Sequence, residues 1–227
     1  MSLPTLRAEG LAYRRGEHAL FSDFSFALPA GQLTWLRGHN GRGKTSLLRL
    51  LAGLAQPDAG RVTWGDVPLP DAPDFALRRV YIAHANALKD DLTAFESLEF
   101  LAALHGRATT PSAVSGALSR LGMAARQRAP VRTLSQGQRR RVALARLALE
   151  SDSGVWVLDE PFDALDVDGI AAVNGLIEQH LERGGSVVLT SHQPLSLAGV
   201  TPSVVELDQR AALPPRRPPL SASAALP

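Results

Sequence analysis

Short runs of apolar, often β-branched residues recur along the chain, with glycine-rich or helical segments between them. They predict strands at 32–37, 61–64, 80–83, 155–158, 186–190 and 204–207. Strands that alternate with helices are typical of an α/β sheet. Two further alternating stretches, at 6–13 and 21–28, are joined by a polar turn at 14–17, which favours antiparallel pairing. We therefore expect an α/β fold with a mixed sheet in its N-terminal part.

The β pattern stops between residues 92 and 128, where two helical patterns take its place. The first opens with Thr93 and Glu96, which are spaced as a helix capping box. Its apolar positions recur at helical spacing and comprise Phe95, Leu98, Leu101 and Leu104. The pattern predicts a helical subdomain inserted into the α/β core. We find no internal repeat.

The amino-acid composition excludes several classes of protein. The 227 residues are 45% hydrophobic and 20% charged, which excludes disorder or a coiled coil for the whole chain. A net charge of +2 gives no electrostatic case for a dedicated nucleic-acid binder. The absence of cysteine excludes disulfides, thiolate metal sites and cysteine nucleophiles, and it fits a reducing compartment. No apolar window has the length of a membrane span and no secretory signal opens the chain, so we expect a cytosolic protein that relies on another polypeptide for any membrane-spanning part.

A phosphate-binding motif follows the strand predicted at 32–37. The sequence matches the pattern G-x-x-x-x-G-K-[ST] and is followed by an apolar helix predicted at 46–54. Such a loop directs backbone N–H groups and a helix N-terminus at phosphate oxygens, with Lys44 reaching the β and γ phosphates and Thr45 binding Mg²⁺. The predicted ATP-binding residues of this segment are Gly38, His39, Asn40, Gly41, Arg42, Gly43, Lys44, Thr45 and Ser46, with the Arg42 side chain expected in solvent.

Two carboxylates end the apolar strand predicted at 155–158, as in a Walker B element. Asp159 is placed to hold Mg²⁺ through water, and Glu160 to act as the general base that orients and polarises the attacking water. An apolar run ending in Asp-Glu is common when it stands alone. Its weight comes from the P-loop 115 residues upstream, between Lys44 and Asp159.

A third motif consists of Leu134, Ser135, Gln136, Gly137 and Gln138. Ser135 and Gln138 have the spacing of a capping box, so the motif predicts the N-terminus of a helix over 139–149, with free N–H groups that can contact a phosphate. The pentapeptide resembles the ABC signature LSGGQ, with Gln136 in place of the first glycine. Ser135 lies 24 residues before Asp159, the interval typical of that family.

With these three motifs, residues 3–208 resemble the nucleotide-binding subunit of an ABC transporter. The resemblance implies the ABC ATPase fold of P-loop NTPases, an α/β class with a mixed-sheet core, an antiparallel β subdomain and a helical insertion. We expect one domain over 1–210, with the core and β subdomain at 1–91 and 148–210 and the helical subdomain at 92–147. Residues 211–227 are rich in proline and predict a flexible tail.

The resemblance assigns roles to four further residues. It makes Tyr13 an aromatic that stacks on adenine, the alternative being a half-buried strand residue. It places Asp166 in the D-loop, which communicates between two sites of a dimer, rather than in an ordinary turn. It makes His192 the switch histidine, which contacts the γ-phosphate. His192 is therefore expected to be catalytic, together with Glu160 and Lys44. At the Q-loop position the chain has His84 instead of glutamine, and a residue that only shapes the loop is an equal alternative.

One branch of the family fits best. His84, the segment 98–106 and the segment 156–166 resemble the CcmA family, the ATP-binding subunit of the haem exporter of cytochrome c biogenesis. The resemblance implies an ATP- and Mg²⁺-dependent peripheral subunit on the cytoplasmic face of the bacterial inner membrane, with CcmB- and CcmC-type membrane partners. ATP hydrolysis would drive release of the haem-loaded chaperone, or haem export. The sequence shows no Cys-x-x-Cys-His haem motif, and we expect no direct haem site.

In this family each nucleotide lies between the P-loop of one subunit and the signature of another, which implies a dimer of this chain. We expect membrane partners to dock where Leu88, Leu92 and Phe95 offer apolar side chains. The alternatives are the ATPase of a different ABC exporter or importer, a soluble ABC ATPase acting on DNA or ribosomes, and a binding module without catalysis. The short chain argues against the soluble class, and the presence of Lys44 and Glu160 argues against the last.

Overall fold

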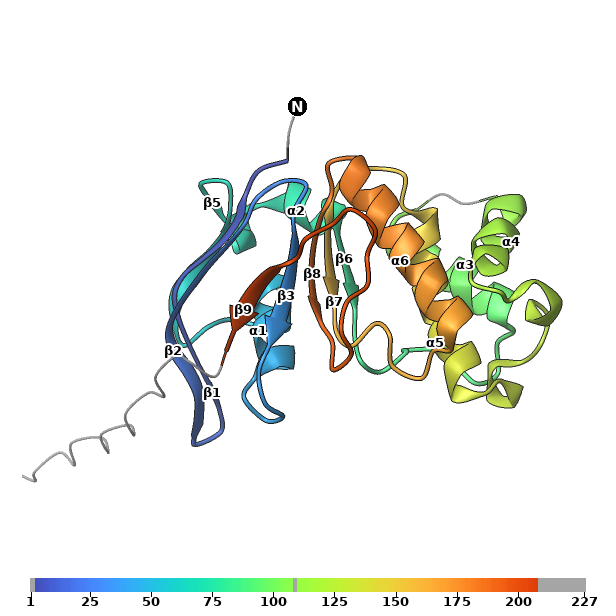
Figure 1. The fold of residues 1–227 in the computed structure, drawn as a ribbon, viewed down its shortest axis with the longest axis horizontal. Coiled ribbons are helices and arrows are strands. Elements are labelled where there is room, and N and C mark those ends of the chain that lie inside the picture. Colours follow the sequence, from blue (N-terminus) through green and yellow to red (C-terminus); the bar gives the residue numbers. More distant parts are fainter. Residues whose placement is uncertain (1–2, 108–109, 208–227) are drawn as a thin grey trace, which may run out of the picture.

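The computed structural model describes residues 3–107 and 110–207. Figure 1 shows its three parts: an antiparallel sheet, a central parallel sheet, and a group of helices on the far side of α6 (Val167–Glu182). The Pro-rich segment 211–227, expected to be a flexible tail, lies outside the described residues. None of the helices in the described part of the chain combines the length and the apolar character needed to cross a membrane.

The antiparallel sheet has the order β2-β1-β4-β5. Its strands are β1 (Leu6–Arg15), β2 (His18–Leu28), β4 (Ala59–Trp64) and β5 (Val67–Pro68). The predicted pairing of the first two strands is confirmed, with Leu6 opposite Leu28 and Arg15 opposite His18. The two strands extend to a tight turn in which Gly16 has φ +60°, a conformation that glycine adopts without strain.

The second sheet is entirely parallel and has the order β6-β7-β8-β3-β9. Its strands are β3 (Leu33–Arg37), β6 (Arg79–Ile82), β7 (Val155–Leu158), β8 (Ser186–Thr190) and β9 (Ser203–Glu206). The expectation of one mixed sheet was therefore wrong. Strand β3 pairs with β8 on one side and β9 on the other, which leaves it no free edge for the antiparallel strands.

The helices agree with the predicted segments, with shifted ends. The longer ones are α1 (Lys44–Leu51), α3 (Ala94–Leu104), α4 (Pro111–Arg120), α5 (Gln136–Leu144) and α6. A short α2 (Pro73–Arg78) precedes β6, and short 3₁₀ helices occupy η1 (Leu69–Asp71), η2 (Ala124–Arg126), η3 (Val131–Thr133) and η4 (Ala145–Leu149). The helix predicted at 139–149 is thus α5 followed by a 3₁₀ turn. The capping box of α3 is confirmed: Thr93 accepts from the Glu96 N–H while Glu96 accepts from the Thr93 N–H.

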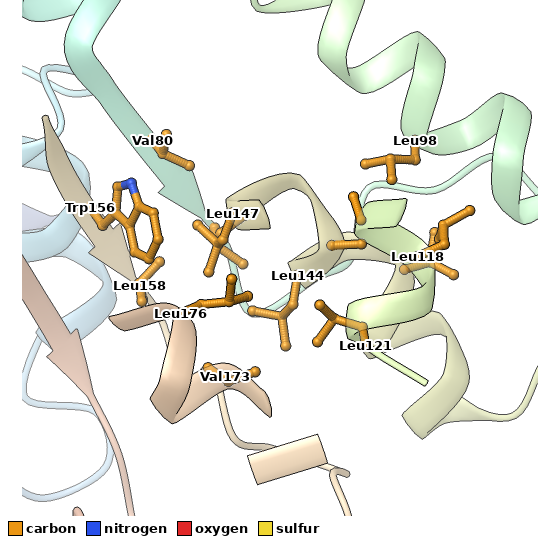
Figure 2. Packing of buried hydrophobic residues seen from close by; sticks show 14 of the residues in the cluster. Val80, Leu98, Leu118, Leu121, Leu144, Leu147, Trp156, Leu158, Val173 and Leu176 are labelled. Carbon is orange, nitrogen blue, oxygen red and sulfur yellow. The ribbon is translucent and has the colours of Figure 1, made fainter. Parts of the chain in front are cut away.

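The parallel sheet is buried on both faces, because α1 and the antiparallel sheet pack on one face and α6 with the helical region packs on the other. Successive side chains of each strand point to opposite faces. In β7, Val155 and Val157 pack with α1 and the antiparallel sheet, whereas Trp156 and Leu158 pack toward α6. Figure 2 shows this second cluster continuing from Trp156 through Leu176 and Leu147 to the side chains of α3 and α4. The helical region therefore shares a hydrophobic core with the sheet, which ties its position to that of the strands bearing the carboxylates.

Candidate functional site

The P-loop joins β3 to α1 at the carboxyl edge of the parallel sheet. Gly43 is the N-cap of α1 with φ +95°, and a Cβ there would lie 3.0 Å from the Leu20 side chain, so only glycine fits this turn without strain. The Lys44 ammonium donates to the Gly38 carbonyl at 2.7 Å and lies 3.4 Å from the His39 carbonyl oxygen. These contacts hold the Lys44 side chain against the backbone of the P-loop.

A cavity of about 510 Å³ lies beside this loop. It brings together most of the predicted site, although the residues come from five segments of the chain. Its lining comprises Arg15, His18, Leu20, His39, Asn40, Gly41, Gly43, Lys44, Thr45, Ser46, His84, Asp159, Glu160 and His192. Arg42 is exposed, as expected, and Gly38 lines a neighbouring cavity behind the loop.

Asp159 is 2% exposed and both of its carboxylate oxygens accept hydrogen bonds. Thr45 Oγ1 donates to Oδ2 at 2.8 Å, and Thr190 Oγ1 donates to Oδ1 at 2.9 Å. The first bond joins the P-loop helix to the end of β7, and the second joins β7 to β8. Thr190, which is fully buried, was not anticipated from the sequence, where it reads as the last residue of an apolar strand.

Glu160 has φ +48°, a left-handed conformation that costs a residue with a side chain about 1–2 kcal/mol. Its N–H donates to Thr190 Oγ1 at 2.9 Å, and its Oε2 accepts from the His192 N–H at 3.0 Å. Its Oε1 has no hydrogen-bond partner among the described residues, but it lies 3.4 Å from His192 Nε2. The strained backbone and the His192 contacts aim the carboxylate into the cavity.

Burial raises the pKa of Glu160 above that of an ordinary glutamate, and the charge of Asp163 adds to the effect. His192 and Lys44 act in the opposite direction, because their positive charge and the His192 N–H favour the carboxylate. A carboxylate with a raised pKa is a stronger base, so the environment suits Glu160 to accepting a proton from water.

The structure places Tyr13 away from the cavity and His84 on its wall. Tyr13 does not line the cavity; its ring stacks on Phe21, 6.2 Å away between centroids, and packs against the core. Irregular pairing on both sides of Tyr13 breaks the two-residue alternation of β1, and Arg15 and His18 face the cavity instead. His84 lies on the cavity wall, and its Nδ1 is 3.7 Å from an Asp163 carboxylate oxygen.

The signature segment lies outside this cavity. Ser135 caps α5 and, with Gln138, completes the predicted capping box: the Ser135 hydroxyl accepts from the Gln138 N–H, and Gln138 Oε1 accepts from the Ser135 N–H. Leu134 is buried and Gln136 is exposed, so the glutamine side chain has room at the position where the pattern LSGGQ has its first glycine. A Cβ at Gly137 would lie 2.5 Å from the Ala164 carbonyl oxygen, which requires glycine there. None of the five signature residues lines the cavity beside the P-loop of the same chain.

Asp166, the predicted D-loop residue, is the N-cap of α6. Its carboxylate accepts from the Gly169 N–H at 2.9 Å and from the Arg141 guanidinium. These bonds hold the pKa of Asp166 below its usual range. The bond to Arg141 links the start of α6 to the signature helix.

Solved structures show the same architecture. An ATP-binding protein of a putative ABC transporter from Pyrococcus furiosus superposes with a TM-score of 0.76 at 23% identity, covering 92% of this chain and 100% of that one. A second structure, the ATP-binding subunit of an ABC transporter, gives a TM-score of 0.73 over 82% of this chain and 79% of the other. At these identities the similarity establishes the fold.

The sequence establishes the family. Residues 21–163, more than half of the chain, match the family model described as ABC transporter. The chain therefore belongs to the ABC transporter family, as an ATP-binding protein and ATPase.

Its relatives define the branch. The cytochrome c biogenesis ATP-binding export protein CcmA of Nitrosomonas europaea is 45% identical over 197 residues, covering 86% of this chain and 92% of that protein. CcmA of Escherichia coli K12 is 45% identical over 194 residues, covering 85% and 91%. Within the ABC transporters, the chain is a member of the CcmA family, as the sequence motifs had indicated.

Proposed function

We propose that this chain is the ATP-hydrolysing subunit of a haem exporter ABC complex in c-type cytochrome biogenesis. Similarity to CcmA proteins along nearly the whole chain carries the proposal, and a cavity that gathers P-loop, carboxylates and switch histidine supports the ATPase part. Hydrolysis would be coupled to release of the haem-loaded chaperone or to haem export.

Glu160 is the general base of the proposed reaction. A water molecule between its carboxylate and the γ-phosphate transfers a proton to Glu160 as the water oxygen bonds to phosphorus and the bond to the ADP oxygen breaks. Lys44 and the backbone N–H groups of the P-loop bind the phosphates, and Ser46 lies at the same end of α1. His192, 3.4 Å from Glu160 at Nε2, is placed to contact the γ-phosphate on one side and the base on the other.

Mg²⁺ fits the chemistry of the donors at Thr45 and Asp159. A hydroxyl and a carboxylate oxygen lie 2.8 Å apart at the cavity wall, and Mg²⁺ in such sites takes one or two protein oxygens and completes its shell with phosphate and water. In the described part of the chain no three His, Asp or Glu residues form a metal cluster, which agrees with a site that is completed by the nucleotide. When bound, Mg²⁺ offsets the negative charge of the phosphates.

A second copy of the chain completes each nucleotide site. The cavity is lined by the P-loop but by none of the five signature residues, which lie at the N-terminus of α5. Pairing two chains head to tail places the signature N–H groups of one on the phosphates in the other. ATP then adds contacts across the interface and closes the dimer. Loss of phosphate after hydrolysis removes these contacts and opens it.

Membrane subunits of the CcmB and CcmC type are the proposed partners, at the cytoplasmic face of the inner membrane. We propose that they dock on α3 beside the residues expected from the sequence, Leu88, Leu92 and Phe95. Those side chains are half-buried, and Leu88 and Phe95 pack against the core. On the same helix, Phe100 and Leu104 are 45% and 65% exposed, one turn apart on one face, and Lys89 lies 5.0 Å above the Phe100 ring.

Phe100→Asp tests this docking surface with less damage to the fold than Phe95→Asp would cause. The variant should lose co-purification with the membrane partners while its ATP binding and thermal stability stay unchanged. Glu99→Gln, at an exposed neighbouring position of α3, is the matched control and should co-purify normally. Undiminished co-purification of the Phe100 variant would exclude this surface.

The function is tested by purifying the tagged Glu160→Gln protein from detergent-solubilised membranes of its own organism, with mass spectrometry and a haem spectrum of the eluate. Recovery of CcmB- and CcmC-type proteins together with haem is the expected result. Recovery of a different membrane pair without haem would retain the ABC ATPase and refute the haem export function.

A further inference from the structure

Arg140 is the buried member of a run of three arginines in the signature helix. It is 2% exposed, and its guanidinium reaches two loops that flank the nucleotide cavity. Nη1 donates to the Ala83 carbonyl at 2.8 Å and to the Asn86 side-chain oxygen at 3.1 Å. Both acceptors lie in the loop after β6 that contains His84, the residue at the Q-loop position.

The other nitrogen of the same guanidinium binds the end of β7. Nη2 donates to the carbonyl oxygens of Asp159 and Glu160, each at 2.8 Å. Glu160 is therefore held at its N–H by Thr190 and at its C=O by Arg140. These two bonds flank the positive φ of this residue, so they stabilise the backbone conformation that directs its carboxylate into the cavity.

The arginine is an unusual choice for a purely structural position. No carboxylate in the described ranges lies within ion-pair distance of its guanidinium, and burial lowers its pKa, although Asp163, Asp159 and Glu160 act in the opposite direction. A buried charge without a direct ion partner is costly. The planar guanidinium is, however, the side chain that can donate in several fixed directions at once, which joining two loops requires.

The same helix carries the signature at its N-terminus, where Ser135 is the cap, and Arg140 lies five residues further on. In the proposed dimer that N-terminus contacts the nucleotide of the other site. We propose that Arg140 is a positioning residue for hydrolysis. It fixes the position of Glu160 in its own site relative to the signature helix, whose N-terminus contacts the nucleotide of the neighbouring site. This inference rests on the proposed ATPase and its dimeric site.

The test compares Arg140→Gln with Arg146→Gln in the full-length protein. Arg146 is a matched control, because it is also buried and its guanidinium also binds a carbonyl of β6, at Tyr81, together with His105. It contacts neither Asp159 nor Glu160. For each variant, kcat and KM for ATP, ATP affinity and thermal stability are measured.

Arg140→Gln should lower kcat by about 100-fold, the scale of loss when a reacting group moves by about 1 Å, and leave ATP affinity nearly unchanged. Arg146→Gln should lower thermal stability with little change in kcat. Equal losses of kcat in both variants, or an unchanged kcat in Arg140→Gln, would overturn the inference. If Arg140→Gln does not fold, Arg140→Lys decides, because it keeps the charge but cannot span both loops, and a wild-type kcat would then refute the role. Absence of hydrolysis in the wild-type protein would instead contradict the proposed function, and with it the inference.

Discussion

The stability of this fold should depend on the protonation of a histidine far from the nucleotide. His180 in α6 is fully buried, and its ring stacks on Trp156 with centroids 3.9 Å apart and planes within 9°. Nε2 donates to the Gly154 carbonyl at 3.0 Å, whereas Nδ1 has no partner among the described residues. A second proton on Nδ1 would be buried without an acceptor.

Burial, aided by the charge of Arg183, lowers the pKa of His180 from 6.5 to about 4. In the unfolded chain the imidazole accepts a proton near pH 6.5, so the unfolded state binds more protons than the folded state between pH 6.5 and 4. The contribution of His180 is therefore complete above pH 6.5 and is lost as the pH falls toward 4. At about 1.4 kcal/mol per pH unit, the loss is about 3 kcal/mol.

His180→Gln removes the titrating group and keeps a donor for the Gly154 carbonyl. Urea unfolding of wild type and variant at a series of pH values measures the difference in their free energies of unfolding. That difference should change by about 3 kcal/mol between pH 6.5 and 4. A His180 difference that stays constant across this range would exclude this link between His180 protonation and stability.

Three further predictions concern the site. Thr190→Val removes the hydroxyl that joins Asp159 to the Glu160 N–H, and it should lower the free energy of unfolding by about 2–3 kcal/mol in urea titrations, while Thr190→Ser restores it. Gly137→Ala places a methyl group 2.5 Å from the Ala164 carbonyl oxygen, so a destabilisation of about 1–3 kcal/mol is expected by thermal unfolding, and an unchanged melting temperature would contradict the close approach. Glu160→Gln should abolish phosphate release and retain an ATP-bound dimer on size-exclusion chromatography; undiminished turnover would exclude Glu160 as the base.

The sequence correctly predicted those elements whose structure is determined by residues close together in the chain. The strands at 155–158 and 186–190 have the predicted bounds, and the capping boxes of Thr93 and Ser135 form as expected. Glycines, a lysine and a threonine at fixed spacing are sufficient to define the P-loop. In each case the pattern and the structure it specifies lie within about ten residues.

Local patterns could not predict the features that depend on packing between distant segments. Two separate sheets replace the mixed sheet because β3 has neighbours on both edges, which no local pattern encodes. Tyr13 faces the core because of irregular pairing within β1. In the sequence Arg140 stands in a run of three arginines that no local pattern distinguishes, and only the approach of the loops at Ala83 and Glu160 makes it a buried, multiply bonded side chain.

A mixed dimer shows directly whether two chains share each ATP site. Lys44→Ala disables the P-loop of one chain, and Ser135→Arg disables the signature of the other, so each variant should be inactive when it pairs with itself. Dimers that contain one chain of each kind, isolated through two different tags, have one site with an intact P-loop and an intact signature from different chains. If two chains share each site, ATP hydrolysis returns in these mixed dimers. Mixed dimers that form but remain inactive would contradict this arrangement.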